Sequence, residues 1–337
     1  MCGICGIYHL DGKPVNQELL ERMNDTMIHR GPDGYGLFID NNIGLGHRRL
    51  AIIDLHTGKQ PMATEDGVLQ VVFNGEIYNF LELKKELEGF GHRFRTQSDT
   101  EVLLHGYRQW GEHFVEHLRG MFAIALWDAN NRKLLLIRDR VGKKPLYYYW
   151  DEKRLVFGSE LKALLADPSI PREMDPAALD AYCSFGYVPS PLSIFKGIKK
   201  LPSAHMAVCT PDKTSLHAYW DVNMDTVTEP IEEGRAVAEL REIFDESVRL
   251  RMISDVPLGA FLSGGVDSSA VVAAMGLQGG KPIKTAAIGF DDKRFNELKY
   301  AGIVAKRYHT DHSEFIVKPD ALDIIEKMGW HFDAPFA

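Results

Sequence analysis

The amino-acid sequence predicts two domains of different class, a sheet-rich α+β layered domain followed by a parallel α/β domain. The chain has 337 residues, which is long enough for two domains. Up to about residue 220 it contains many short apolar or alternating runs bounded by Gly, Asp and Asn, which are typical of strands. From about residue 234 helical and strand patterns alternate, as they do in parallel sheets with crossover helices.

In the first region the patterns predict strands joined by a few helices. Helical spacing of apolar residues predicts helices at 16–28, 80–88 and 100–110, and Asp99 is the expected N-cap of the third. A hairpin is expected around 205–220, after a Pro-rich passage. The expected strands are 2–8, 43–54, 68–73, 121–127, 133–138, 145–150 and 154–158.

In the second region strands and helices are expected to alternate. Residues 223–233 are polar and acidic and predict a linker between domains 2–222 and 234–337. The elements expected after it are a helix at 234–253, a strand at 256–262, a helix at 268–277, a strand at 283–290, a helix at 297–308 and a strand near 313–317.

Composition and charge exclude several classes of protein. The sequence is 45% hydrophobic and 26% charged, which excludes a disordered chain, a collagen-like fibre and a coiled-coil rod. The net charge is −8 and no long basic run is present, so we expect neither nucleic acid nor a membrane as a partner. There is no signal-peptide pattern, and four cysteines are too few for a disulfide framework. We expect a cytoplasmic protein with reduced thiols.

A Ser-Gly-Gly-Val-Asp-Ser-Ser segment predicts a phosphate-binding loop. An apolar strand enters it, Gly264 and Gly265 turn it, and a hydroxyl-rich helix start leaves it. Glycine lets backbone N–H groups approach an anion, and a helix N-terminus favours phosphate there. Ser263 and Ser268 add hydroxyl donors, and Asp267 is a candidate ligand for Mg²⁺ against the phosphate oxygens. The Lys of a Walker-type loop is absent, and an ordinary strand–helix turn is the alternative.

The second residue is a candidate nucleophile. Once Met1 is removed, Cys2 carries a thiol and an α-amine, whose pKa of about 7.7–8.0 suits it to accept the thiol proton. The resulting thiolate can attack a carboxamide carbon. An unremarkable terminal residue is one alternative, and a metal or redox pair with Cys5 is another. Cys183 and Cys209 do not provide the second CxxC spacing that a metal site would need.

Three downstream side chains strengthen this hypothesis. Arg49 is placed to clamp an α-carboxylate with its guanidinium. Asn74 offers an amide beside an exposed backbone N–H, and such donors stabilise a tetrahedral oxyanion. Asp99 supplies a carboxylate for a substrate ammonium. Each has a structural alternative, respectively a surface ion pair, a hairpin turn and a helix cap.

The order of these motifs resembles that of class II glutamine amidotransferases. They are Cys-Gly-Ile-Cys-Gly from Cys2, His-Arg-Gly-Pro-Asp at 29–33, Arg-Leu at 49–50, Asn-Gly-Glu-Ile-Tyr-Asn at 74–79 and Ser-Asp at 98–99. With the later Ser-Gly-Gly-Val-Asp-Ser-Ser, the whole chain resembles the glutamine-hydrolysing asparagine synthetase family. The resemblance implies a four-layer αββα amino-terminal-nucleophile sandwich, followed by an incomplete parallel α/β domain of the ATP-pyrophosphatase type.

The resemblance also implies roles for particular residues. Cys2 would be the nucleophile with its own amine as base, and Asn74 and Gly75 the oxyanion hole. Arg49 would bind the α-carboxylate of glutamine, and Gly75, Glu76 and Asp99 its α-amine. The residues expected at ATP, with Mg²⁺ at Asp267, are Leu262, Ser263, Gly264, Gly265, Asp267, Ser268, Ile288 and Gly289.

The implied reaction joins two chemical steps. Glutamine is hydrolysed at Cys2, and the ammonia passes internally to amidate an ATP-activated aspartate with release of AMP and pyrophosphate. Alternatives are the same chemistry on another carboxylate (for example in polysaccharide or peptide tailoring), a glutaminase with a non-productive nucleotide-binding domain, and a non-catalytic interaction protein. β-Lactam synthetases are disfavoured because they generally lack the amino-terminal Cys. A homodimer is left open.

The sequence departs from the family pattern near its last residue. It reads His-Phe-Asp-Ala-Pro-Phe-Ala where the family reads Asp-Glu-Pro-Phe-Ala-Asp and continues, so we expect a fragment or an incomplete gene model. A parallel sheet cut after about three strands would leave apolar surface uncovered. Ala334 stands where the family has a Glu that handles protons, and the neighbouring Asp333 is the candidate substitute.

Overall fold

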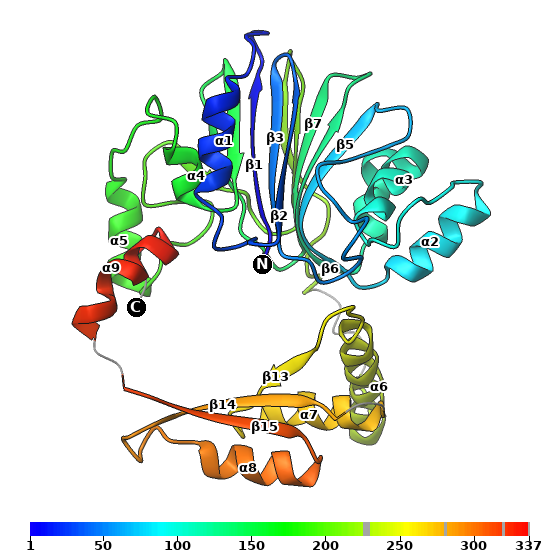
Figure 1. Ribbon diagram of the computed structural model, residues 1–337, viewed down its shortest axis with the longest axis vertical. Coiled ribbons are helices and arrows are strands. Elements are labelled where there is room, and N and C mark those ends of the chain that lie inside the picture. Colours follow the sequence, from blue (N-terminus) through cyan, green and yellow to red (C-terminus); the bar gives the residue numbers. More distant parts are fainter. Residues whose placement is uncertain (225–229, 280–281, 319–320, 336–337) are drawn as a thin grey trace. The chain divides into compact units, whose positions relative to one another are not determined.

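The computed structural model describes residues 1–224, 230–279, 282–318 and 321–335, without the side chains of 321–323. It contains two compact units, Met1–Val222 with Glu326–Ala337, and Asn223–Ile325 (Figure 1). Part of the expected linker, residues 225–229, lies outside the described residues, as do the last two residues of the expected second domain.

The first unit contains two antiparallel six-stranded sheets. The first sheet has the order β10-β8-β9-β1-β3-β2 and the second β12-β11-β7-β6-β5-β4. The strands of the first sheet are β1 (Gly3–His9), β2 (Gly34–Asp40), β3 (Ile43–Arg49), β8 (Tyr147–Trp150), β9 (Arg154–Gly158) and β10 (Ile198–Lys200). Those of the second are β4 (Met62–Ala63), β5 (Leu69–Ile77), β6 (Gly120–Asp128), β7 (Lys133–Arg138), β11 (His205–Cys209) and β12 (Thr214–Ala218).

Helices cover the outer face of each sheet, so the first unit has four layers (Figure 1). α1 (Gln17–Asp25) and α4 (Leu161–Leu165) pack on the first sheet, and α2 (Phe80–Gly89) and α3 (Glu101–Trp110) on the second. Each sheet forms one hydrophobic core with its helices. A further hydrophobic core lies between the two sheets, where Leu45 of β3 and Val72 of β5 are buried. This αββα arrangement confirms the predicted fold class. A 3-10 helix (Gly111–His117) and α5 (Pro176–Phe185) complete the unit.

The alternation of side chains along β5 determines which site residues face the other sheet. Val72 faces the other sheet, whereas Phe73 faces the helices α2 and α3. Because side chains alternate along a strand, Asn74 and Glu76 follow Val72 toward the space between the sheets. The sandwich therefore presents these two polar side chains to the strands of the first sheet.

The second unit contains a three-stranded parallel sheet with the order β13-β14-β15. Its core includes Leu262, Val272, Ala287 and Ala301, from the sheet and its crossover helices. This confirms the predicted parallel α/β class. The elements are α6 (Glu233–Arg251), β13 (Gly259–Phe261), α7 (Val266–Leu277), β14 (Lys284–Phe290), α8 (Leu298–Arg307) and β15 (Asp311–Val317), and α9 (Ala321–Phe332) follows. Among the described residues, no helix is long and apolar enough to span a bilayer.

Two strand predictions were wrong around the site. The strand expected at 43–54 ends at Arg49, because Asp54 has a φ of 53° and the guanidinium of Arg49 binds the carbonyl groups of the following loop. The strand expected to end at residue 73 continues to Ile77, so Asn74 and Gly75 form no hairpin turn. β5 continues because β6 remains paired with it to its end, at Gly120.

Candidate active site

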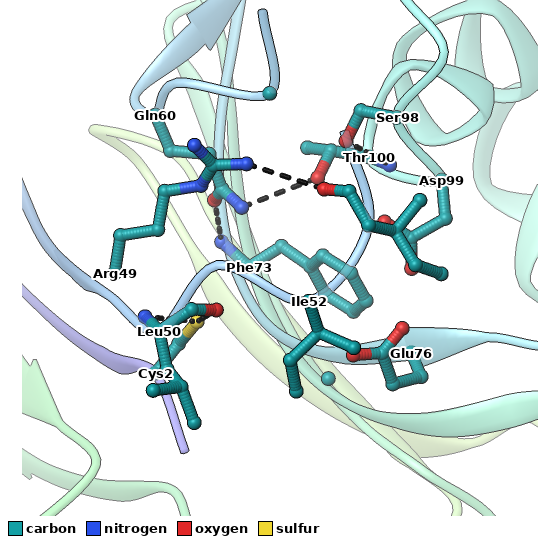
Figure 2. Close-up of a pocket in the computed structure, with 13 residues that line it drawn as sticks. Cys2, Arg49, Leu50, Ile52, Gln60, Phe73, Glu76, Ser98, Asp99 and Thr100 are labelled. Carbon is teal, nitrogen blue, oxygen red and sulfur yellow. Dashed lines mark hydrogen bonds between the residues drawn. The ribbon is translucent and has the colours of Figure 1, made fainter. Parts of the chain in front are cut away.

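A pocket that is open to solvent brings together most of the predicted residues of the first unit. Cys2 precedes β1, Arg49 ends β3, Gly75 and Glu76 lie on β5, and Asp99 precedes α3. Figure 2 shows Cys2 and Arg49 on one side of this pocket and Glu76 and Asp99 on the other. Residues up to 97 positions apart in the sequence thus meet at one end of the sandwich.

Cys2 is half-buried at the edge of the pocket. Its Sγ accepts the backbone N–H of Leu50 at 3.4 Å. Burial raises the pKa of this thiol, although the Leu50 N–H partly offsets the effect. In this chain the α-amine belongs to Met1 and donates to the Arg30 carbonyl oxygen at 3.0 Å. Cys2 therefore gains an amine of its own only when Met1 is removed.

The strand register directs the N–H of Gly75 toward the pocket. On β6, Phe122 exchanges hydrogen bonds with Asp139, at 3.2 and 2.9 Å, and so turns its backbone away from β5. The opposed Gly75 is therefore at a non-hydrogen-bonded position of the ladder. A Cβ at position 75 would lie 2.1 Å from the Met121 carbonyl oxygen, so only glycine fits here. No described residue accepts this N–H, and Gly75 lines the same pocket as Cys2.

Asn74 is completely buried, and neither atom of its amide has a hydrogen-bond partner among the described residues. It lies beside the pocket rather than on its wall. An unpaired buried amide costs free energy in the folded state, so such a group is retained where another role requires it. Its neighbour Gly75 supplies the second donor, which makes this pair suited to an oxyanion.

Glu76 and Asp99 are neighbouring carboxyl groups in the pocket, Glu76 half-buried and Asp99 buried. Burial raises the pKa of Glu76, and the nearby Asp99 raises it further. Burial also raises the pKa of Asp99, against the N–H of Ile77, which donates to its Oδ2 at 2.9 Å. The helix-cap expectation for Asp99 was wrong, because Thr100 is the N-cap residue of α3. Two neighbouring carboxyl groups with raised pKa values suit a cationic group.

The Arg49 guanidinium orders the loop that closes the pocket. It donates to the carbonyl oxygens of Ile53 and Leu55, each at 3.2 Å, and to that of Asp54. Arg49 also lines the pocket, so one side chain combines loop support with a positive charge near Cys2. It forms no ion pair with any residue that the structure describes, so the surface ion pair considered as its alternative is not present there.

Several supporting residues were missed by the sequence analysis. Gln60 accepts the N–H of Phe73 at 2.7 Å, and Arg30 donates its Nε to the Cys2 carbonyl oxygen at 2.8 Å. His47 is buried with its Nε2 3.1 Å from the Phe73 carbonyl oxygen, and burial lowers its pKa to about 3, which keeps the ring neutral. No local pattern could have indicated these contacts, since each joins distant segments.

The predicted phosphate loop lies in the second unit, between β13 and α7. Ser263 Oγ lies 3.0 Å from Ser268 Oγ and accepts the N–H of Gly265 at 3.2 Å. Gly264 has a φ of 82°, the left-handed region that favours glycine. α7 begins at Val266, two residues before the prediction, because Gly265 is its N-cap residue. The loop thus precedes the positive end of a twelve-residue helix.

The remaining predicted nucleotide residues share this edge of the sheet. Ile288 is half exposed near the carboxyl end of β14, next to β13. Gly289 leaves room for Leu298 of α8, which a Cβ would approach to 2.5 Å, so its small size also serves packing. The side chain of Leu262 is buried, and only its backbone faces the edge. Asp267 is exposed on the first turn of α7, and no cluster of three metal-ligating side chains occurs in the described segments.

Comparisons with known proteins agree with this geometry. Residues 1–220 match the family described as a glutamine amidotransferase domain, and residues 239–337 match asparagine synthase. A solved structure titled as the allosteric regulatory enzyme of purine biosynthesis aligns with a TM-score of 0.51. Its sequence is 15% identical, and the alignment covers 94% of this chain and 81% of the solved chain. At this identity the likeness is evidence of the fold only.

Two curated relatives match over the whole of this chain. Asparagine synthetase [glutamine-hydrolyzing] 1 of Bacillus subtilis is 39% identical, and this chain spans 54% of its length. A protein of Methanocaldococcus jannaschii named "Putative asparagine synthetase [glutamine-hydrolyzing] 2" is 38% identical, and the chain spans 69% of it. With the αββα sandwich, the parallel α/β unit and both family matches, the chain belongs to the glutamine-hydrolysing asparagine synthetase family.

Proposed function

We propose that this chain carries the glutamine-hydrolysing site and the ATP-binding loop of a glutamine-dependent asparagine synthetase. Glutamine gives ammonia at Cys2, and the ammonia amidates an ATP-activated aspartate with release of AMP and pyrophosphate. The observation that carries the proposal is the meeting of Cys2, the Gly75 N–H and the Glu76–Asp99 pair in one pocket. The family matches in both parts of the chain support the second half of the reaction.

The proposed hydrolysis begins with removal of Met1. The α-amine of Cys2 takes the proton of its own thiol, and the thiolate attacks the carboxamide carbon of glutamine. The Gly75 N–H and the unpaired Nδ2 of Asn74 stabilise the oxyanion. Collapse returns the proton to the leaving nitrogen, releases ammonia and leaves a thioester, which water hydrolyses to glutamate and free thiol.

The proposed substrate orientation follows from the charges of the pocket. Arg49 binds the α-carboxylate, and Glu76, Asp99 and Gly75 receive the α-ammonium. A bound ammonium favours the charged carboxylates and therefore lowers their raised pKa values. Glutamine binding and deprotonation of this pair are coupled as a result.

The proposed ATP site uses the loop between β13 and α7. Backbone groups from Leu262 to Gly265 and the hydroxyls of Ser263 and Ser268 would bind the phosphates, and Ile288 and Gly289 the adenine. The exposed carboxylate of Asp267 fits Mg²⁺, which uses one or two carboxylates together with phosphate oxygens. Bound there, Mg²⁺ would neutralise phosphate charge during adenylation. The side chains of this chain hold and orient the nucleotide.

We further propose the domain limits 2–222 and 234–337 with a linker at 223–233, and a cytoplasmic location with reduced thiols. The four cysteines are free in the structure, which is compatible with a reducing compartment. Assembly as a homodimer belongs to the same proposal.

The test is product formation from glutamine, aspartate and Mg-ATP by the wild-type chain and Cys2→Ala. We expect the wild type to form glutamate from glutamine, and asparagine and AMP to be formed together. Cys2→Ala should lose glutamate formation, whereas Cys183→Ala, a change at an exposed cysteine, should keep it. Glutamate formation that survives Cys2→Ala would contradict the proposal.

A second candidate function is the same first step with ammonia delivered to another carboxylate. Ala334 favours it, because this side chain packs on the core of α1 and α4 at the position where a glutamate is expected. Glutamine-dependent AMP without asparagine would support this candidate. Glutamate without AMP would instead indicate a glutaminase with a non-productive nucleotide domain.

A further inference from the structure

A row of alternating charges begins at Asp333, immediately after α9, within the first unit. The two oxygens of its carboxylate bind one residue. Oδ1 pairs with the Nζ of Lys162 at 3.0 Å, and Oδ2 accepts the Lys162 backbone N–H at 3.1 Å. The same Nζ lies 2.6 Å from Oε2 of Glu160. Lys162 is thus shared between two carboxylates.

The row continues from Glu160 to the nucleophile. Its Oε1 accepts NH1 of Arg30 at 2.8 Å. The Nε of Arg30 donates to the carbonyl oxygen of Cys2, also at 2.8 Å. The segment after α9 is therefore joined to the backbone of Cys2 by an unbroken series of polar contacts, which runs through Asp333, Lys162, Glu160 and Arg30.

These four charges are largely removed from water. The exposed fractions of the side chains are 11% for Asp333, 12% for Lys162, 10% for Glu160 and 9% for Arg30. Burial acts to raise the pKa of Glu160, but hydrogen bonds from Lys162 and Arg30 outweigh it and hold this pKa below its usual range. At such burial, losing one member leaves the next charge uncompensated. Removing a charge at one end should therefore disturb the contacts of every other member of the row.

The segment around Asp333 is fixed by further contacts in the same unit. Lys162 Nζ lies 4.7 Å from the centre of the Trp330 ring, and the His29 ring lies 4.6 Å from it. His29 also contacts Glu160, at 3.1 Å. Asp333 itself has a φ of 58°, a costly conformation for a non-glycine residue that surrounding contacts must maintain. Trp330 and Asp333 fall by sequence in the asparagine synthase match, although they pack on the amidotransferase unit.

We propose that Glu160 is a positioning residue for Cys2, and that the Asp333–Lys162 pair sets its position. The segment 326–335 would thereby control the rate of glutamine hydrolysis. Arg30 fixes the Cys2 carbonyl and with it the direction of the thiol, and Glu160 fixes Arg30. None of Glu160, Lys162 and Asp333 lines the glutamine pocket. The inference rests on the proposed hydrolysis of glutamine at Cys2.

A role in positioning predicts a particular kinetic signature. Because the row does not touch substrate, its loss should lower kcat for glutamate formation and leave KM within about twofold. We expect roughly a tenfold or larger loss of kcat in Glu160→Gln and a several-fold loss in Asp333→Asn, since misorientation of a reacting group is costly. Asp333→Glu should restore most of the rate.

A double-mutant cycle separates this role from a general loss of stability. The variant with both Glu160→Gln and Asp333→Asn should be no slower than Glu160→Gln alone, because both changes interrupt one row. Glu173→Gln is the matched control, since it breaks an exposed pair with Lys196 at 3.1 Å and should leave kcat unchanged. If Glu160→Gln does not fold, the comparison of Asp333→Asn with Asp333→Glu decides.

The outcomes distinguish this inference from the proposed function. Wild-type kcat in Asp333→Asn, or additive losses in the double variant, would overturn the inference, while loss of activity in Cys2→Ala would keep the function. A wild-type chain that releases no glutamate from glutamine would overturn both.

Discussion

The proposed glutamine pocket around Cys2 and the proposed phosphate loop between β13 and α7 are built in opposite ways. Beside the pocket, the amide of Asn74 is buried without a partner among the described residues, and burial raises the pKa values of Glu76 and Asp99. The loop exposes its side chains, including Asp267, and relies on backbone groups at a helix start. Substitutions in the pocket should therefore change stability and activity in opposite directions, whereas those in the loop should change mainly affinity.

The largest contrast is expected at Asn74. Asn74→Ala should lower kcat for glutamate formation roughly 10²–10³-fold, as loss of an oxyanion donor does. Its thermal stability should be unchanged or higher, because the wild-type amide has no hydrogen-bond partner among the described residues to lose. Steady-state kinetics and thermal denaturation of the same samples measure both effects.

Asn79 provides the control for Asn74. It is also buried, but its amide donates to the His117 carbonyl at 3.0 Å and accepts the Arg119 N–H at 2.9 Å. Asn79→Ala should cost about 1–3 kcal/mol of stability and leave kcat nearly unchanged. The opposite pattern in the two variants would mean that Asn74 is a structural residue.

The next effect is expected from Glu76→Gln. Loss of a charged partner for the substrate ammonium should raise KM for glutamine about 10- to 100-fold, since such a bond is worth about 1.5–3 kcal/mol. Exposed Glu82 on α2 offers a matched change, and Glu82→Gln should not alter KM. Equal KM values in Glu76→Gln and wild type would remove Glu76 from the site.

The same variant has a defined effect on pH dependence. The pKa of Glu76 is raised in the folded protein, so the folded state binds the proton more tightly than the unfolded state. Its contribution to stability is complete below the unfolded pKa of about 4.3 and is lost as pH rises through the folded pKa. Glu76→Gln should therefore raise Tm relative to wild type at alkaline pH and not at pH 4. Thermal melts from pH 4 to pH 9 test this.

Substitutions at the two adjacent glycines of the loop are expected to affect different properties, stability at Gly264 and ATP affinity at Gly265. Gly264→Ala should cost about 1–2 kcal/mol or more, because its φ is 82° and a Cβ would lie 2.5 Å from the Ala301 nitrogen. Gly265→Ala meets only Ser263 Oγ, at 3.3 Å, and should fold normally but bind ATP less tightly. Thermal melts with and without Mg-ATP measure both. Normal ATP binding by Gly265→Ala would argue against a phosphate site here.

The smallest effect is expected at Asp267. Asp267→Asn removes an exposed charge and should leave Tm unchanged. It should weaken ATP binding several-fold in Mg²⁺ and hardly at all in EDTA, because the carboxylate acts through the metal ion. Calorimetric titration in the two buffers makes the comparison. An equal loss in both would exclude the proposed Mg²⁺ role.

Sequence patterns predicted the elements whose signal is local. Both fold classes and most strands of the core follow from alternation and apolar runs. β2 (Gly34–Asp40) was missed because its side chains are mostly half-buried or exposed, and α5 was missed although Asp175 caps it and Pro176 begins it. An Asp at the N-cap position followed by Pro at the first helical position is a recognised signal for a helix start, and it would have indicated α5.

The site was predictable only in part, because its residues come from segments that are far apart in the sequence. Cys2, Arg49, Gly75 and Asp99 were identified through motifs whose order resembles a family, since no spacing rule brings them together. Glu160 and Arg30 lie 130 positions apart, and their ion pair depends on the packing of α4 against α1. A contact of that range leaves no trace in a single sequence.

The central claim is that Cys2 reacts as the first residue of the processed chain. Its most direct test is intact-mass and peptide mass spectrometry after incubation with an electrophilic glutamine analogue. The account predicts one adduct, on the thiol of Cys2, in chains that lack Met1 and not in chains that retain it. An adduct on another residue, or equal labelling of Met1-retaining chains, would contradict it.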